Sequence, residues 1–161
     1  MYRIFALCFV LAVSVGCSKD GDETKKTDEP KKTTPAAAFE LSPFGLTGDA
    51  PAGTKTRKMG KKVMVQGNGL VVTVGLAGRF DAADLAAATK EATSNTGTNL
   101  KPETLADGFL LTYENKGGAG SNYWVVSNRK IDGKAYSCGT TASNAGQQAN
   151  AAKFCKSRKK K

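Results

Sequence analysis

The sequence predicts an α+β domain in which an antiparallel sheet of about five strands packs with two helices. Short runs rich in β-branched and aromatic residues alternate in hydrophobicity, as half-buried strands do. Two alanine-rich segments carry the spacing of helices, and tight-turn signals join most of the runs. In chain order the elements are strand, strand, helix, strand, strand, strand and helix.

The first two strands are predicted at Lys62 to Gln66 and Leu70 to Leu76. Gly67-Asn68-Gly69 separates them and is typical of a hairpin turn. In the second strand the alternate residues Leu70, Val72, Val74 and Leu76 share one face, which predicts one buried side. Before this hairpin, residues 41–60 are dense in Pro, Gly and Thr, so we expect an irregular start with at most a short strand.

The first helix is predicted within "RFDAADLAAATKEATSN", which follows the hairpin. Asp81 is the expected N-cap. Leu85, Ala88 and Ala92 are spaced to share the buried face of the helix. The next residues, Thr93 to Asp107, form a polar region in which we expect turns.

Three further strands are predicted at Phe109 to Glu114, Asn122 to Asn128 and Lys134 to Thr140. The segment "NKGGAGS" joins the first pair, and Asp132-Gly133 marks a tight turn between the second pair. The final helix is expected to begin at Ser143 or Asn144. This order of elements loosely resembles that of the PsbP-like α/β/α sandwich.

Aromatic residues gather in the same three strands, at positions 113, 123, 124 and 136. Two interpretations are open for them. They line a ligand groove, or they form core and cross-strand contacts.

The first sixteen residues predict a secretory signal peptide. Arg3 precedes thirteen uncharged residues, Ile4 to Gly16, whereas a membrane-spanning helix needs about 20 apolar residues. Export and cleavage place the mature chain outside the cytoplasm and remove Cys8 with the signal.

The end of this run, Ser14-Val15-Gly16-Cys17, resembles a bacterial lipobox. The resemblance implies a diacylglycerol thioether on Cys17, cleavage before that residue and acylation of the new amino terminus. Ser18 occupies the position where an aspartate would resemble an inner-membrane retention signal, which favours the outer membrane over the inner membrane. The alternative is ordinary cleavage after Ala12-Val13-Ser14, which leaves three cysteines in the mature chain.

The chain therefore divides into a signal peptide (1–16), a lipidated cysteine with a disordered tether (17–38), one domain (39–155) and a basic tail (156–161). The tether holds prolines, lysines, acids and threonines but no large apolar residue, so it lacks the means to form a core.

Cys138 and Cys155 are expected to form a structural disulfide. A helix from Asn144 to Cys155 advances about 17 Å, and the six residues before it reach about 20 Å when extended. A helix that folds back along its preceding strand therefore brings the two sulfurs together. A redox-active pair would need a closer spacing such as C-x-x-C.

The positive charge is concentrated in two clusters, "KTRKMGKK" and "KFCKSRKKK", within a chain of net charge +10. These clusters could bind lipid headgroups or a polyanionic glycan. Nucleic acid is disfavoured because Phe154 is the only ring in either cluster. The alternative is a solvated strand edge and a frayed tail. The candidate anion-binding residues are Lys55, Arg57, Lys58, Lys61, Lys62, Lys153, Lys156, Arg158, Lys159, Lys160 and Lys161.

No catalytic, metal or cofactor motif is found in the sequence. Histidine is absent, which removes the commonest general base and metal ligand. We therefore expect a membrane-anchored lipoprotein whose domain is a non-catalytic structural or protein-interaction module of the cell envelope. A binding module for an anionic envelope component is the alternative, and an enzyme with a carboxylate-based site is the least favoured hypothesis.

Overall fold

The computed structural model describes residues 36–118 and 120–161, all of which belong to one compact unit. The predicted signal peptide, Cys17 and most of the predicted tether lie outside the described residues. In chain order, the elements are β1 (Ala36–Leu41), the 3-10 helix η1 (Ser42–Phe44), β2 (Leu46–Pro51), β3 (Lys55–Met59), β4 (Lys62–Gly67), β5 (Leu70–Leu76), α1 (Leu85–Ser94), β6 (Thr98–Leu105), β7 (Gly108–Gly117), β8 (Gly120–Ile131), β9 (Lys134–Ala142), α2 (Ala145–Ser157) and β10 (Lys159–Lys160).

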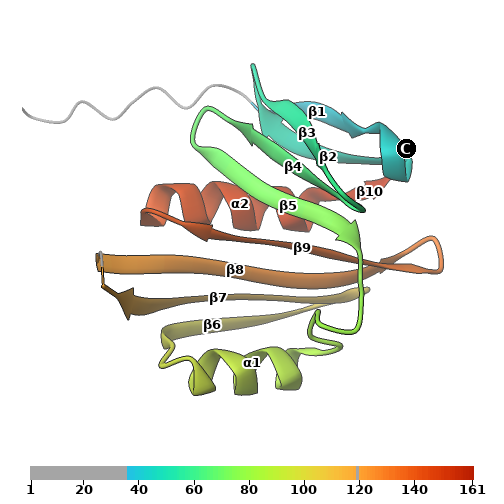
Figure 1. The fold of residues 1–161 in the computed structure, drawn as a ribbon. Helices are drawn as coiled ribbons and strands as arrows, with labels where there is room; N and C mark the ends of the chain where they lie inside the picture. The colour runs from blue at the N-terminus through green and yellow to red at the C-terminus, as the bar shows by residue number, and fades with distance from the viewer. Residues whose placement is uncertain (1–35, 119) are drawn as a thin grey trace, which may run out of the picture. The chain divides into compact units, whose positions relative to one another are not determined.

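The strands form two antiparallel sheets (Figure 1). The larger sheet has seven strands in the order β3-β4-β5-β9-β8-β7-β6, and the smaller has three in the order β1-β2-β10. Consecutive hairpins build both halves of the larger sheet. The pairing of β5 with β9 joins these halves, with Val74 opposite Cys138.

One face of the larger sheet is covered by α2 and by the smaller sheet. Leu70, Val72 and Val74 of β5 are buried on this face as predicted and belong to one core with Val63 and Val65 of β4. The prediction is wrong for Leu76, which is 55% exposed at the end of the strand. From α2, Phe154 is fully buried in the same core and reaches β2, where a Cβ at Gly48 would lie 3.1 Å from its ring. This core therefore joins the two sheets and α2.

The opposite face is covered by α1 over β6, β7 and β8 only. Ala88 and Ala92 of α1 pack against Phe109, Leu111 and Tyr113 of β7, which forms a second and smaller core. The part of this face made by β4, β5 and β9 carries no helix. We call this whole face of the larger sheet, opposite α2, the open face.

The disulfide connects β9 to α2 in the larger core. The sulfurs of Cys138 and Cys155 are 1.96 Å apart, and their Cα atoms are 5.7 Å apart. The helix folds back on its preceding strand, as the reach of the two segments predicts. Closing a loop of this length stabilises the fold by about 3 kcal/mol in the chain-entropy model.

The α+β class, the antiparallel pairing and the two helices are confirmed, but the strand count is wrong because the described residues form ten strands in two sheets. The missed strands lie mainly in residues 41–60 and 93–107. All five residues of β3 are exposed, and β6 at the other edge has no fully buried residue. Edge strands of this kind lack the hydrophobic alternation that identifies a strand in a sequence.

Several boundaries also differ from those expected. The N-cap of α1 is Asp84, not Asp81, and its side chain accepts a hydrogen bond from the Ala87 N–H. Residues 36–38 belong to β1 rather than to the tether. The final helix begins after Asn144, one of the two expected caps, and runs past Cys155 to Ser157. Beyond it β10 pairs with β2, so the last residues are not a frayed tail.

Candidate functional site

The first basic cluster lies at the edge of the larger sheet. Lys55, Arg57 and Lys58 are exposed residues of β3, and Lys61 follows in the turn to β4. Within the described chain no ion pair involves these four residues, which we call the edge cations. The fifth member, Lys62, instead forms an ion pair with Asp81, at 3.0 Å.

Three of the six basic residues of the second cluster have exposed acidic partners. Lys156 pairs with Glu103, Lys160 with Asp132 and Lys161 with Glu40. The pKa of Lys160 is raised by its hydrogen bond and charge interaction with Asp132. Lys153 and Lys159 are exposed.

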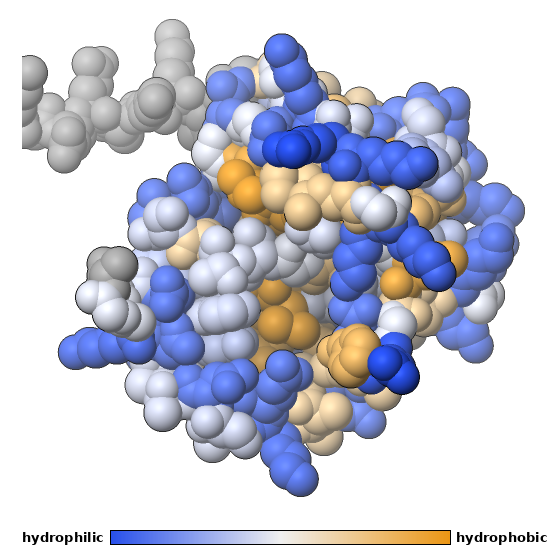
Figure 2. All heavy atoms as spheres, viewed as in Figure 1, coloured by the Kyte–Doolittle hydropathy of each residue, from blue (hydrophilic) through white to orange (hydrophobic). Residues whose placement is uncertain are grey.

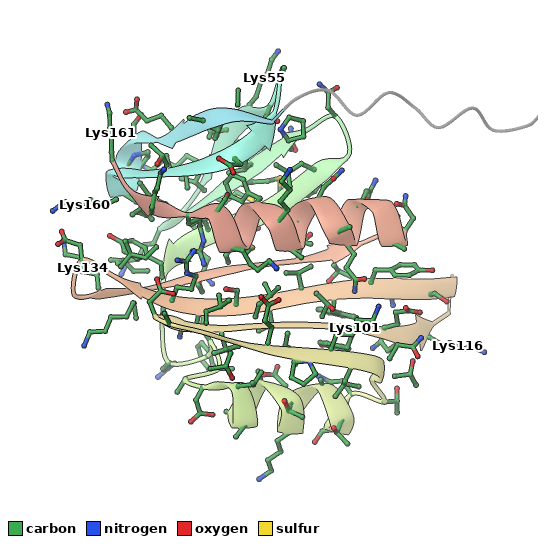
Figure 3. All side chains as sticks on the ribbon, turned by 180° about the vertical axis from the view of Figure 1, so that it is seen from behind. Lys55, Lys101, Lys116, Lys134, Lys160 and Lys161 are labelled. Atoms are coloured by element: carbon green, nitrogen blue, oxygen red, sulfur yellow. A yellow bond between two sulfur atoms is a disulfide. The ribbon has the colours of Figure 1, made fainter. Side chains whose placement is uncertain are left out.

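The two clusters come from different parts of the fold, but Lys58 and Lys61 lie near Pro43 and Phe44 of the turn between β1 and β2. Seen from behind, Lys55 lies well apart from Lys160 and Lys161 (Figure 3). The smaller sheet carries Lys159 and Lys160, whereas the edge cations belong to the larger sheet.

Arg158 is a correction to the sequence prediction, because its side chain is buried with only 1% exposed. Its guanidinium donates to the carbonyls of Cys155 at 3.1 Å and Ser137 at 3.3 Å, and to Ser127 Oγ at 3.4 Å. Burial, reinforced by the nearby charge of Arg129, lowers the pKa of Arg158 to about 9. Arg158 therefore holds the end of α2 against β8 and β9 and is not available to an external anion.

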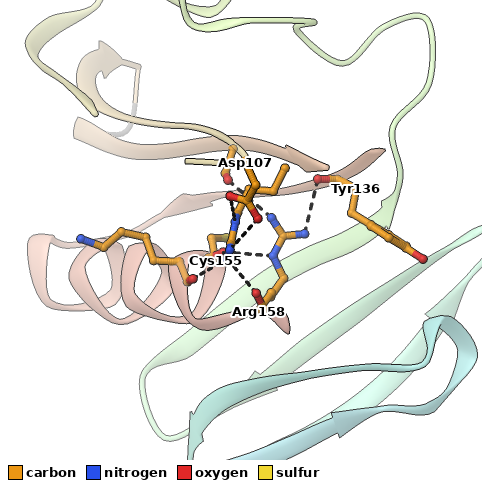
Figure 4. A network of polar contacts seen from close by, with 7 residues as sticks. Asp107, Tyr136, Cys155 and Arg158 are labelled. Carbon is orange, nitrogen blue, oxygen red and sulfur yellow. Dashed lines mark hydrogen bonds and ion pairs between the residues drawn. The ribbon is translucent and has the colours of Figure 1, made fainter. Parts of the chain in front are cut away.

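Arg129 belongs to the same network of polar contacts, in which Figure 4 labels Asp107, Cys155 and Arg158. Its Nε and Nη2 each donate to one carboxylate oxygen of Asp107, at 2.8 Å. Its Nη1 donates to the carbonyls of Lys156 and, at 2.8 Å, Arg158. The hydrogen bond from Arg129 is the largest cause that lowers the pKa of Asp107. A cation thus satisfies carbonyls left free at the end of a helix, where the helix dipole favours positive charge.

The uncovered part of the open face contains a hollow of about 350 Å³. In Figure 2 it appears as a recess of pale and orange side chains in the middle of the face, bordered by hydrophilic residues. Its volume lies at the lower end of the range for small-molecule sites.

Small residues on β5 and β9 make the floor of this hollow. Thr73 pairs with Gly139, and Gly75 pairs with Ser137. Side chains of paired residues point to the same face of a sheet, so β5 and β9 carry only small side chains on the open face at these positions. Asn128 of β8 also lines the hollow and donates to the carbonyl of Ala82, at 3.0 Å.

An ion pair forms part of the rim. Lys62 extends across Gly75, where an added Cβ would lie 2.6 Å from Lys62 Cγ, and it reaches Asp81 beyond. Burial raises the pKa of Asp81, but the hydrogen bonds from the Gly78 N–H and from Lys62 outweigh this effect and leave the pKa below its ordinary value. Asp81 is therefore a carboxylate that fixes the loop between β5 and α1.

Aromatic side chains complete the walls. Trp124 stacks on Tyr113 with ring centroids 5.7 Å apart, and its Nε1 donates to Asn115 Oδ1 at 2.9 Å. Phe80 is 85% exposed at the rim and carries the Arg79 guanidinium 4.5 Å from its ring centroid. Tyr136 points to the other core, against Phe44. Tyr113 and Trp124 thus form a cross-strand pair, and both also line the hollow.

Ser137 contributes a polar group without a hydrogen-bond partner. It is 7% exposed, and its Oγ is buried with no partner among the described residues. The hydroxyl lies near enough to Asp81 to contribute to the lowering of the pKa of that carboxyl, whose oxygens also accept from Gly78 and Lys62. A buried hydroxyl without a partner is costly and uncommon, so its place in a hollow marks a position for a ligand or a water.

No protein-family model and no curated protein matches this chain. The part of the chain that the structure describes contains no group of three or more Cys, Asp and Glu residues that could hold a metal ion. Within residues 36–118 and 120–161 there is no helix long and apolar enough to cross a membrane.

The hollow itself was not predicted from the sequence. Thr73, Ser137 and Gly139 have no distinctive spacing, and only the pairing of β5 with β9 brings them together. The aromatic residues at positions 113 and 124 were the one signal that pointed to it.

We expect Asp107→Asn to lower the free energy of unfolding at pH 7 by about 1–3 kcal/mol, since Arg129 then loses its carboxylate partner and buried Arg158 loses a nearby negative charge. Because the folded pKa of Asp107 is lowered, its contribution is complete above the unfolded pKa and is lost as the pH falls through the folded pKa. Urea unfolding at pH 7 and at more acidic pH measures both effects.

The matched control is Asp132→Asn, which removes an exposed partner of Lys160 and should leave stability unchanged. Equal stability of Asp107→Asn and the unaltered protein at pH 7 would contradict the role given to the network.

Proposed function

We propose that the protein is an exported lipoprotein, anchored through Cys17 in the outer membrane, whose domain works by binding and not by catalysis. In this proposal the domain is an interaction module of the cell envelope. The tether allows it to reach partners away from the membrane surface.

Two features support the anchored and extracytoplasmic part of the proposal. The lipobox-like residues before Cys17 supply the attachment site. The Cys138–Cys155 pair suits an oxidising compartment, since disulfides are rare in cytosolic proteins.

Helices on both faces of an antiparallel sheet also fit the PsbP-like α/β/α sandwich, which we retain as the proposed fold relationship.

The observation that carries the binding function is the hollow on the open face. An antiparallel sheet commonly leaves one face to water, so an uncovered face alone says little. Here the face is walled by α1, by the loop before it and by the Lys62–Asp81 pair, and its floor is made of small residues. A concave, walled surface is the usual form of a recognition site.

A second candidate function is binding of an anionic envelope component, and the edge cations favour it. They are exposed and without ion pairs in the described chain, unlike three residues of the C-terminal cluster. The attraction would be electrostatic and would weaken as salt screens it.

Intact mass spectrometry of the protein purified from membranes tests the anchor. The expected mass is that of a chain beginning at Cys17 and carrying a diacylglycerol group and an amide-linked acyl chain. A mass equal to that of the unmodified chain 15–161 would overturn the anchor.

Photo-cross-linking in intact cells tests the binding surface. Gln66 is an exposed residue of β4 on the open face, paired with Val71, and Lys101 is exposed on β6 on the opposite face. We expect a photoreactive residue at Gln66 to give discrete cross-linked products and the same residue at Lys101 to give none. Products from Lys101 alone would contradict a binding role for the open face.

Sedimentation with anionic vesicles tests the second candidate, using a chain that begins at Ser18 and so lacks the proposed anchor. Replacing all four edge cations with Gln should weaken retention at low salt by at least about tenfold, because each of the four charges contributes up to about 1 kcal/mol near the surface. Lys156→Gln with Lys160→Gln and Lys161→Gln is the matched control and should change retention less. No retention of the unaltered chain at low salt would exclude this function.

A further inference from the structure

We propose that the hollow on the open face binds a neutral saccharide of about two sugar rings. This inference rests on the proposed function, because it assigns a ligand class to the same binding surface. It draws on the polar groups of the hollow, its charge, its aromatic walls and its length.

The polar groups suit a ligand that carries hydroxyls. Ser137 Oγ is buried, lines the hollow and has no partner among the described residues. A serine hydroxyl both donates and accepts, as does a sugar hydroxyl. The floor adds hydroxyls from Thr73 and Thr141, and Asn128 supplies an amide whose Nδ2 is already fixed by Ala82.

The charges of the hollow disfavour an anionic ligand. Its only lining cation is Lys62, which is paired with Asp81, and Glu91 from α1 adds a second carboxylate. The groups that line the hollow therefore carry a net negative charge, and Arg79 adds a cation only at the rim, over Phe80. The edge cations do not line the hollow, so an anion-binding function on β3 would be separate from this site.

Aromatic rings at both ends suit the apolar C–H faces of sugar rings. Trp124 and Asn128 both line the hollow and are four residues apart on β8, which corresponds to about 13 Å. Phe80 belongs to the loop that Asn128 holds through Ala82, so it lies toward the Asn128 end. The distance between Trp124 and that end fits two linked rings.

The only tryptophan in the chain is Trp124, so its emission reports on this site alone. The full-length protein, purified from membranes in a zwitterionic detergent without a sugar headgroup, is titrated with cellobiose, maltose and N,N′-diacetylchitobiose. We expect at least one of them to change the emission saturably at millimolar concentration. Saturation-transfer NMR should show contact through the C–H protons of that sugar.

Two variants place the ligand in the hollow. Ser137→Ala should weaken binding about fivefold to tenfold, the effect of one lost hydrogen bond. It should leave thermal stability unchanged or raised, because it removes a hydroxyl without a partner. Phe80→Ala alters an exposed side chain, so the fold is kept, and it should also weaken binding. The control is Lys101→Ala, an exposed residue of β6 on the opposite face, which should bind as the unaltered protein does.

The ligand class is overturned if none of the three sugars gives a saturable change. The site is overturned if a sugar binds but Ser137→Ala and Phe80→Ala bind it as tightly as the unaltered protein. Cross-linking from Gln66 that persists in either case would leave the proposed binding function standing without its saccharide ligand. Loss of cross-linking with sugar binding intact would refute the protein-partner role alone.

Discussion

The placement of α2 between the two sheets is the constraint on which the rest of the structure depends. Cys155 ties the helix covalently to β9, and Phe154 fills the space against β2. Ser157 Oγ accepts a hydrogen bond from the Asp49 N–H, which holds the smaller sheet to the end of the same helix. Arg129 and Arg158 then satisfy the carbonyls at that end. A covalent bond, an apolar core and a polar network thus fix one helix in one position.

Because α2 and the smaller sheet cover the central strands on one face, recognition by those strands has to use the opposite face. On that opposite face α1 has ten residues, and its buried residues are alanines. Such a helix lies close to β7 but covers little of β5 and β9. The hollow is therefore a consequence of a short helix and of small residues on the two central strands.

The sequence predicted best those features that depend on local pattern. The alternating apolar residues of β5, the cap at Asn144 and the reach between Cys138 and Cys155 all follow from neighbouring residues. It failed for β3 and β6, where exposure on both sides removes the hydrophobic alternation. It also failed for Arg158. This residue lies among lysines in a segment whose composition is typical of an exposed tail, and only the fold shows its buried hydrogen-bond partners. The hollow could not be predicted from the sequence, because its floor depends on how β5 and β9, which are far apart in the chain, pair with each other.

Ser137 connects the two faces of the molecule. Its carbonyl accepts a hydrogen bond from buried Arg158, on the side of α2, while its side chain belongs to the floor of the hollow. The network that closes the end of α2 therefore also fixes the backbone from which the hydroxyl projects. A group held in this way loses little conformational freedom when a ligand binds, which reduces the entropic cost of binding. The rigidity of the covered face thus supports the binding role proposed for the open face.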